Sequence, residues 1–281
     1  MVNPKTGTCS WKFESWVGLV YSQRYRTAAG YLREYSRKYR TAEIDSWFYR
    51  MPDRQTVQDY LNNVDRDFHF TCKLPMVISL THRRKRKGEK VLRENPDFLS
   101  ADLFSEFLEA VAPMADRLDA VMLQFEYLNR KKMASLDHFL RALESFAKNV
   151  PKEVPLAIET RNSNYIHEEY FQFLREKNLI HVFSEKIYMP HVYEVYERFS
   201  GLLAGGAVIR LMGGDRKSIE KQTGKEWNRV VEPKEDLEEV AAMAVDIAEQ
   251  GMGLTVNVNN HYEGSAPLTI EKLERMMGTT G

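Results

Sequence analysis

The sequence predicts a (β/α)8 barrel, that is, a TIM barrel formed by the whole chain. Strand-like runs and helix-like stretches alternate from one end to the other, which is typical of a parallel α/β fold. We count eight segments of each kind, and the 281 residues are close to the roughly 250 of a typical barrel. No linker rich in Gly, Ser or Pro interrupts the alternation. We therefore expect one domain over residues 1–281, with a polar site at the carboxyl ends of its strands.

The predicted elements follow one another in regular order. The strands cover residues 5–11, 41–46, 68–74, 118–125, 155–161, 180–185, 206–212 and 253–260. The helices cover residues 27–39, 54–64, 100–114, 135–150, 167–178, 190–201, 235–251 and 269–278. Ser100 is suited to cap the third helix. The longest irregular segments, about 75–99 and 212–234, follow the third and seventh strands and should lie on the catalytic face.

Strand alternation directs polar side chains into the predicted barrel. Successive side chains of a strand point to opposite faces, and the apolar set should face the helices. In the second strand Ala42 and Ile44 then face outward, while Glu43 and Asp45 face inward. The same division sends inward the polar residues His69, Thr71, Lys73, Gln124, Glu159, Arg161, Arg210, Thr255, Asn257 and Asn259.

Six of these inward groups are charged, three acids and three bases. They are Glu43, Asp45, Lys73, Glu159, Arg161 and Arg210. An unpaired charge inside a barrel is costly, so these groups must pair, reach solvent at the strand ends or bind a ligand. Two interpretations stay open: a structural ion network, for which Glu43 is the deeper candidate, and a catalytic or binding site that uses some of the six.

The composition excludes several classes of protein. Lys and Arg together number 40, as do Asp and Glu, so the formal net charge is zero and gives no general attraction to nucleic acid or acidic membranes. No segment approaches the roughly 18 to 20 apolar residues of a membrane helix. The start, MVNPKTGTCSW, lacks the pattern of a signal peptide, so we expect a cytoplasmic protein that does not bind membranes. Two distant cysteines, Cys9 and Cys72, provide neither a disulfide framework nor a thiolate zinc site.

Six motifs along nearly the full chain carry a family resemblance. They are GTCSWKFESW (7–16), AEIDSWFYRMP (42–52), FTCKLP (70–75) with TH (81–82), AIETRNSNY (157–165), VIRLMGG (208–214) and VNVNNHYEGSAP (256–267). In this order they resemble the signature blocks of the YecE-like family of unknown function. The resemblance implies a TIM barrel and brings no established activity. Asp45, Trp47, Met212 and His261 stand where the family usually has Asn, Thr, His and Asp, so a mechanism that needs a histidine after the seventh strand cannot operate here.

The charged residues favour an anionic ligand. Lys73, Arg161 and Arg210 are suited to hold phosphate or carboxylate, because guanidinium groups bind such anions through paired hydrogen bonds. Asp45 and Glu159 are candidates for proton transfer if their environments separate their pKa values. We therefore expect the catalytic residues to be Asp45, Glu159 and Lys73. The expected substrate-binding residues are Trp11, Trp16, Tyr49, His82, Arg161, Arg210, Asn257 and Asn259.

Cofactor motifs are weak. The histidines form no multi-histidine constellation, which argues against zinc, and we assign no metal ligands. An alternative is magnesium or manganese bound by Glu43, Asp45 and Glu159. The three basic residues would compete with such an ion for the same carboxylates. The segment GGDRKS (213–218) lacks the spacing of a phosphate-binding loop.

Three functional hypotheses result. The first is an enzyme of hydrolase or isomerase type that acts on an anionic small molecule, phosphorylated or a nucleotide, at the barrel mouth. The second is a protein that binds or processes nucleic acid through the basic segment HRRKRKGEK (82–90), although such a segment is more often a solvated loop. The third is a sensor of small molecules without catalysis. The oligomeric state is left open.

Overall fold

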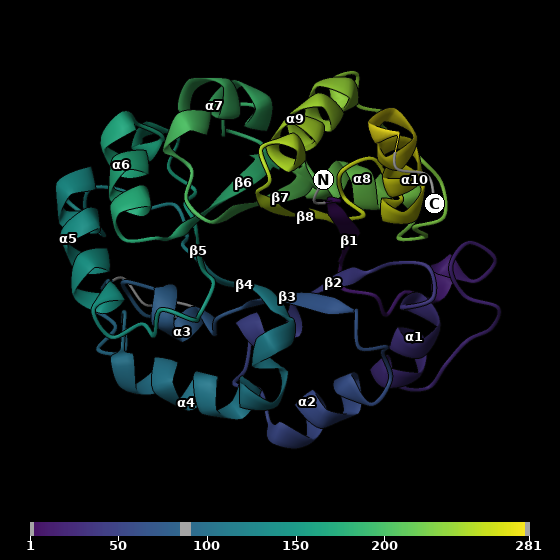
Figure 1. The fold of residues 1–281 in the computed structure, drawn as a ribbon, viewed down its shortest axis with the longest axis horizontal. Coiled ribbons are helices and arrows are strands. Elements are labelled where there is room, and N and C mark those ends of the chain that lie inside the picture. Colours follow the sequence, from purple (N-terminus) through teal and green to yellow (C-terminus); the bar gives the residue numbers. More distant parts are fainter. Residues whose placement is uncertain (1–2, 85–90, 279–281) are drawn as a thin grey trace.

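Eight parallel strands close into a barrel in the computed structural model, which describes residues 3–84 and 91–278. The strands are β1 (Lys5–Cys9), β2 (Thr41–Ile44), β3 (His69–Lys73), β4 (Leu118–Gln124), β5 (Leu156–Glu159), β6 (Ile180–Lys186), β7 (Gly206–Gly213) and β8 (Gly253–Val258). Each strand pairs with the next along the chain, and β8 pairs with β1. Figure 1 shows these strands at the centre with the helices arranged around them. The prediction of a TIM barrel is confirmed.

The helices follow the strands as the sequence predicts, with two additions. They are α1 (Ala28–Tyr35), α2 (Arg54–Leu61), α3 (Met76–Ser79), α4 (Ala101–Val111), α5 (Leu136–Ala147), α6 (Glu168–Glu176), α7 (Val192–Phe199), α8 (Arg216–Thr223), α9 (Leu237–Glu249) and α10 (Ala266–Met277). Helices α3 and α8 correct the expectation that the segments after β3 and β7 are irregular. Helix α8 is capped at its start by Asp215, whose side chain accepts a hydrogen bond from the backbone of Lys217, and at its end by Gly224, which has a left-handed φ of 63°. These are ordinary helix caps, so a local signal for α8 was present in the sequence.

The barrel interior consists of layers. At the amino ends of the strands, Asp119 accepts hydrogen bonds from Lys5 and Thr255. A small apolar cluster lies above this layer and is formed by Ala120, Met122, Ala157, Val182 and Val208. The charged residues that strand alternation predicts lie beyond it, towards the carboxyl ends. Between the strands and the helices lies the main hydrophobic core.

Gly7 permits a very close approach of β1 and β2. A Cβ atom at this position would lie 2.1 Å from the carbonyl oxygen of Thr41 on the neighbouring strand. Any side chain would therefore force the two backbones apart.

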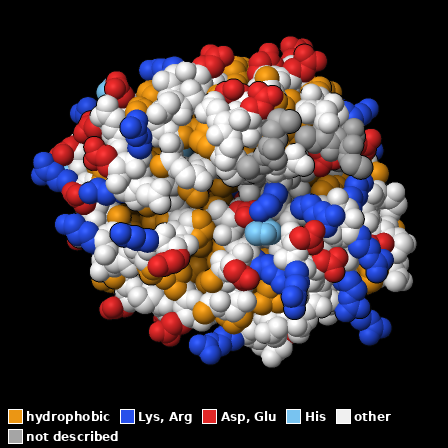
Figure 2. Space-filling model, in the orientation of Figure 1, with side chains coloured by type: hydrophobic (Ala, Val, Ile, Leu, Met, Phe, Trp, Pro, Cys, Tyr) orange, Lys and Arg blue, Asp and Glu red, His pale blue; other side chains and the backbone are white. Residues whose placement is uncertain are grey.

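The surface agrees with the zero net charge. On the face that Figure 2 shows, acidic and basic side chains are mixed over the whole outline. Among the described residues, every helix is too short or too polar to cross a membrane.

Candidate active site at the barrel mouth

Arg210 is the centre of the polar interior. Its side chain is 0% exposed, as are those of Glu43 and Glu159. Arg210 Nε and Nη2 each donate a hydrogen bond of 2.7 Å to a different carboxylate oxygen of Glu43. Nη1 donates to Glu159 and, at 3.2 Å, to Gln124 Oε1. The guanidinium is thus held by two buried carboxylates, and its removal would leave both without their main partner.

Lys73 links this centre to the solvent. Its ammonium contacts Asp45 Oδ1 and lies 3.3 Å from Glu43 Oε1 and 5.3 Å from the centre of the Phe48 ring. The Asp45 side chain is 37% exposed, so this carboxylate reaches the cleft. Burial raises the pKa of Asp45, but Lys73 and Arg210 together lower it more, and the net pKa lies below the usual value. Asp45 is therefore an ionised, accessible carboxylate at neutral pH.

Glu159 is buried among donors. Arg161 Nε and Nη2 lie 2.8 and 2.7 Å from Glu159 Oε1, and Ser184 Oγ donates to the same oxygen at 3.3 Å. Burial raises the pKa of Glu159, whereas Arg161 and Arg210 lower it, and the result is a pKa of about 2. The Glu159 side chain is 0% exposed and its oxygens are engaged by these donors, so the geometry suits it to hold Arg161 and Arg210 in place rather than to exchange protons with a substrate.

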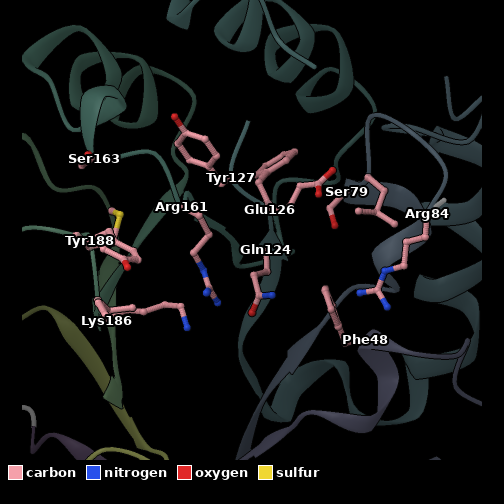
Figure 3. Close-up of a pocket in the computed structure, with 14 residues that line it drawn as sticks. Phe48, Ser79, Arg84, Gln124, Glu126, Tyr127, Arg161, Ser163, Lys186 and Tyr188 are labelled. Atoms are coloured by element: carbon pink, nitrogen blue, oxygen red, sulfur yellow. The ribbon is translucent and has the colours of Figure 1, made fainter. Parts of the chain in front are cut away.

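Lys186 adds a further cation to this assembly. We call the six residues Glu43, Asp45, Lys73, Glu159, Arg161 and Arg210 the charge network. Within it, three carboxylates face three cations, and Lys186 at the end of β6 makes no ion pair with any residue that the structure describes. Burial and the neighbouring Arg161 lower the pKa of Lys186. Figure 3 shows the side chains of Lys186, Arg161 and Gln124 directed into the same space.

A cleft with two lobes opens over the charge network. The polar lobe has a volume of about 530 Å³, and its lining includes Asp45, Lys73, Arg216 and His261. The larger lobe, of about 760 Å³, is lined by aromatic and apolar side chains with a few polar ones, among them Phe125, Tyr127, Ile187 and Tyr188. Both lobes share the lining residues Phe48, Gln124, Arg161 and Lys186. The cleft thus joins a charged floor to an apolar wall.

Backbone strain occurs at the edge of this cleft. Ser10, just after β1, has a φ of 73°, and Tyr188, after β6, has a φ of 70°. Residues other than glycine adopt this left-handed conformation at a cost of about 1 kcal/mol or more, and such residues often cluster at functional sites. Tyr188 is also 88% exposed, which is unusual for a large aromatic side chain.

Five of the eight predicted substrate-binding residues lie in, beside or directly below the cleft. Tyr49, Arg161 and Asn259 line the polar lobe. His82 lies in the chain between Leu80 and Arg84, which line the larger lobe. It is partly buried, and its Nδ1 lies 3.0 Å from Thr81 Oγ1. Arg210 belongs to the charge network below the cleft, where its donors are already engaged.

Three other predicted residues lie inside the protein. Trp11 and Trp16 are 4% and 0% exposed and belong to the hydrophobic core, where the Trp11 ring packs edge-on against Tyr60. Their burial corrects the expectation that the two indoles bind substrate, because the chain after β1 folds back against α1 and Trp11 Nε1 donates to Ala28 O. Asn257 is buried in the barrel, where it donates to Thr71 Oγ1.

The alternative metal site of Glu43, Asp45 and Glu159 does not form a cluster of free ligands. Each of these carboxylates contacts Lys73, Arg161 or Arg210. Cys9 and Cys72 are buried free thiols, and burial together with Glu43 raises the pKa of both.

Sequence reasoning missed Lys186 and the aromatic wall. In β6 the inward set Val182 and Ser184 continues to Lys186, but the predicted strand ended at residue 185. Extending the alternation by one residue would have found it. Tyr127 and Tyr188 follow strands in loops, where no period indicates their direction.

Comparison with known proteins adds a family and a fold. A family model described as "Protein of unknown function DUF72" matches residues 5–281. The UPF0759 protein YecE of Escherichia coli (strain K12) is 26% identical over 160 residues, which are 57% of this chain and 48% of that protein. The match thus spans about half the length of this curated relative.

Two solved structures of DUF72 family proteins are similar over their whole length. The protein from Enterococcus faecalis V583 has a TM-score of 0.72 at 16% identity, and the alignment covers 100% of this chain and 97% of that one. The protein from Thermotoga maritima MSB8 has a TM-score of 0.69 at 21% identity, with 98% and 99% covered. At these identities the likeness concerns the fold alone.

Proposed function

The chain belongs to the DUF72 family, and from that premise we propose that it is an enzyme of hydrolase or isomerase type that acts on an anionic small molecule at the barrel mouth. The observation that carries the proposal is the excess positive charge of Lys186 over the otherwise balanced charge network. An anion in the cleft would neutralise this charge in a partly dehydrated place, where electrostatic attraction is stronger than in water. The carboxyl end of a barrel is also where enzymes of this fold bind their substrates.

Lys186 and Arg161 are the proposed anion-binding residues. Arg161 is 17% exposed, and its position is fixed by its two contacts with Glu159. Lys186 provides a compact point charge beside it, and both side chains line the two lobes of the cleft. A phosphate or carboxylate group suits this pair, because a guanidinium and an ammonium bind such anions by charge-assisted hydrogen bonds.

The larger lobe favours a substrate with an apolar or planar part. Phe48, Phe125, Tyr127 and Tyr188 contribute to its wall. Aromatic side chains bind flat rings through stacking and edge contacts. A nucleotide or a phosphorylated metabolite with a ring matches both lobes, with the anion at Lys186 and the ring in the larger lobe.

Asp45 and Lys186 are the proposed groups for proton transfer. Asp45 is ionised and accessible and can therefore accept a proton from a substrate in the polar lobe. The lowered pKa of Lys186 makes its ammonium a better proton donor than an ordinary lysine. Lys73 and Glu159 act as positioning residues, Lys73 for Asp45 and Glu159 for Arg161.

A binding experiment tests the anion site. The full chain is screened by thermal shift against phosphorylated metabolites and nucleotides, and the affinity of each hit is measured by calorimetry. We expect Lys186→Gln to weaken binding by tenfold or more, whereas the matched control Lys148→Gln, at an exposed position after α5, should bind as the wild type does. Equal affinity for both variants would contradict the assignment of the anion to Lys186.

Turnover separates an enzyme from a sensor. For any ligand that binds, conversion is followed with the wild type and with Asp45→Asn. Turnover by the wild type supports an enzyme. Loss of turnover with retained binding in Asp45→Asn supports proton transfer by Asp45. Binding without turnover by the wild type would favour the sensor.

The nucleic-acid hypothesis stays a prediction. Of the basic segment 82–90, residues 85–90 lie outside the described residues, while Arg84 lines the larger lobe. Salt-dependent binding of single-stranded DNA or RNA that is lost when this segment is neutralised would favour it.

A further inference from the structure

A second hollow beside the cleft brings together three side chains of metal-ligand type. Glu185 lies near the end of β6, His191 directly before α7, and Asp236 directly before α9. One ligand atom from each of the three lies within 4.8 Å of the other two. All three line a hollow of about 490 Å³, which the segment 186–189 separates from the larger lobe of the cleft.

The two distances from His191 to the carboxylates suit coordination of one ion. His191 Nδ1 lies 3.1 Å from Glu185 Oε1 and 3.1 Å from Asp236 Oδ2. Two ligand atoms that are each about 2.1 Å from a metal, at roughly right or tetrahedral angles, are about 3.0 to 3.4 Å apart. A neutral imidazole has at most one proton on Nδ1, so it cannot donate a full hydrogen bond to both carboxylates. A cation among the three atoms would satisfy all of them.

The ligand side chains are held in position by their surroundings. Glu185 Oε2 accepts a hydrogen bond of 2.9 Å from the backbone of Val192, which leaves Oε1 directed at His191. The His191 ring lies parallel to that of Tyr193, with 5.2 Å between the ring centres. The nearby cation Lys234 contacts Glu232 instead of the three ligands. Such support of the ligands from outside the coordination sphere is usual in metal sites.

Tyr262 supplies an independent observation. This residue is 1% exposed and lines the same hollow. Its hydroxyl is buried without a hydrogen-bond partner among the described residues. A buried hydroxyl without a partner is costly, and buried polar groups are generally paired. A metal ion with its bound water in the hollow would provide the missing partner.

We propose that Glu185, His191 and Asp236 bind a divalent transition-metal ion, Zn²⁺ or Mn²⁺, and that the Tyr262 hydroxyl forms a hydrogen bond to a water on that ion. The mixture of one imidazole and two carboxylates favours these ions over Mg²⁺ and Ca²⁺, which prefer oxygen ligands alone. Three protein ligands leave a coordination position open towards the hollow, as in catalytic rather than structural zinc sites. The site does not depend on the function proposed for the cleft.

Metal binding by the full chain tests the proposal. Protein treated with a chelator is dialysed and titrated with MnCl₂ or ZnCl₂ alone. Binding is followed by calorimetry and, for Mn²⁺, by loss of the electron paramagnetic resonance signal of the free ion. We expect one ion per chain. His191→Asn should weaken binding by at least tenfold and Tyr262→Phe by about tenfold.

A matched variant separates this site from surface binding. His138→Asn, which replaces an exposed histidine in the first turn of α5, should bind metal as the wild type does. Asp236→Asn provides a second ligand variant if His191→Asn does not fold, which the circular dichroism of the metal-free proteins will show. Binding of less than one ion per chain, or unchanged binding in both ligand variants, would overturn the proposal.

Discussion

The two ends of the barrel interior are both polar, but they differ in burial. At the amino end, the side chains of Lys5, His69 and Asp119 are 32%, 27% and 19% exposed. At the carboxyl end, Arg210 and its two carboxylate partners are 0% exposed. A charge near water can be replaced at small cost, whereas a buried charge depends on its partner. The comparison separates polar residues that the fold tolerates from those on which it depends.

The largest effect should follow from replacing the central cation. Arg210→Met leaves Glu43 and Glu159 as buried carboxylates without their main partner, and we expect a loss of about 3 to 5 kcal/mol in the free energy of unfolding. Lys5→Met, the matched change at the amino end, should cost about 1 kcal/mol or less. Urea denaturation followed by circular dichroism measures both. Similar losses at the two ends would show that the difference in burial has no energetic consequence.

An intermediate effect should appear in the pH dependence of stability. The pKa of Glu159 is about 2 in the folded protein, below its ordinary value of 4.5. Its contribution is therefore complete above pH 4.5 and is lost as the pH falls from 4.5 towards 2, by about 3 kcal/mol. Glu159→Gln should make the fall in this range less steep. Arg161→Gln removes one cation that lowers the pKa of Glu159. Its loss of stability with falling pH should be less steep than that of the wild type and steeper than that of Glu159→Gln.

These slopes are obtained from urea denaturation at a series of pH values. The charge network includes Asp45, whose lowered pKa adds to the loss at acid pH, so the slope should be reduced in Glu159→Gln but not abolished. If Glu159→Gln and the wild type lose stability equally steeply, the buried ion pairs of Glu159 do not contribute as described.

The smallest effect on stability should come from the edge of the network. Lys186 lies among cations and has no ion pair with a described residue, so Lys186→Gln should change the free energy of unfolding by no more than about 0.5 kcal/mol. Lys148→Gln is the control, with the same expectation. A loss above 2 kcal/mol for Lys186→Gln alone would mean that this lysine supports the fold rather than a ligand.

Much of the fold and part of the site could be predicted from the sequence. Alternation within strands identified Glu43, Lys73, Glu159 and Arg210 as inward residues, because a period of two depends only on the local backbone. It could not show that these charges neutralise one another, since the reach of a long side chain across the barrel depends on the tertiary structure. The structure shows that Arg210 is engaged in a buried network and that Asp45 reaches the cleft, where a catalytic or binding role stays a prediction.

Residues in loops were beyond such reasoning. Trp11 and Trp16 follow a strand, but the chain turns them into the core rather than towards the cleft. Glu185, His191 and Asp236 come from segments up to 51 positions apart in the sequence, and only the closed barrel brings their ligand atoms together.

The segment 186–189 forms a wall common to the larger lobe and to the hollow of Glu185, His191 and Asp236. An occupant on one side that fixes the conformation of this wall also fixes the surface offered on the other side. Where an occupant changes the conformation of these four residues, linkage makes the effect reciprocal: each occupant then changes the affinity for the other by the same factor.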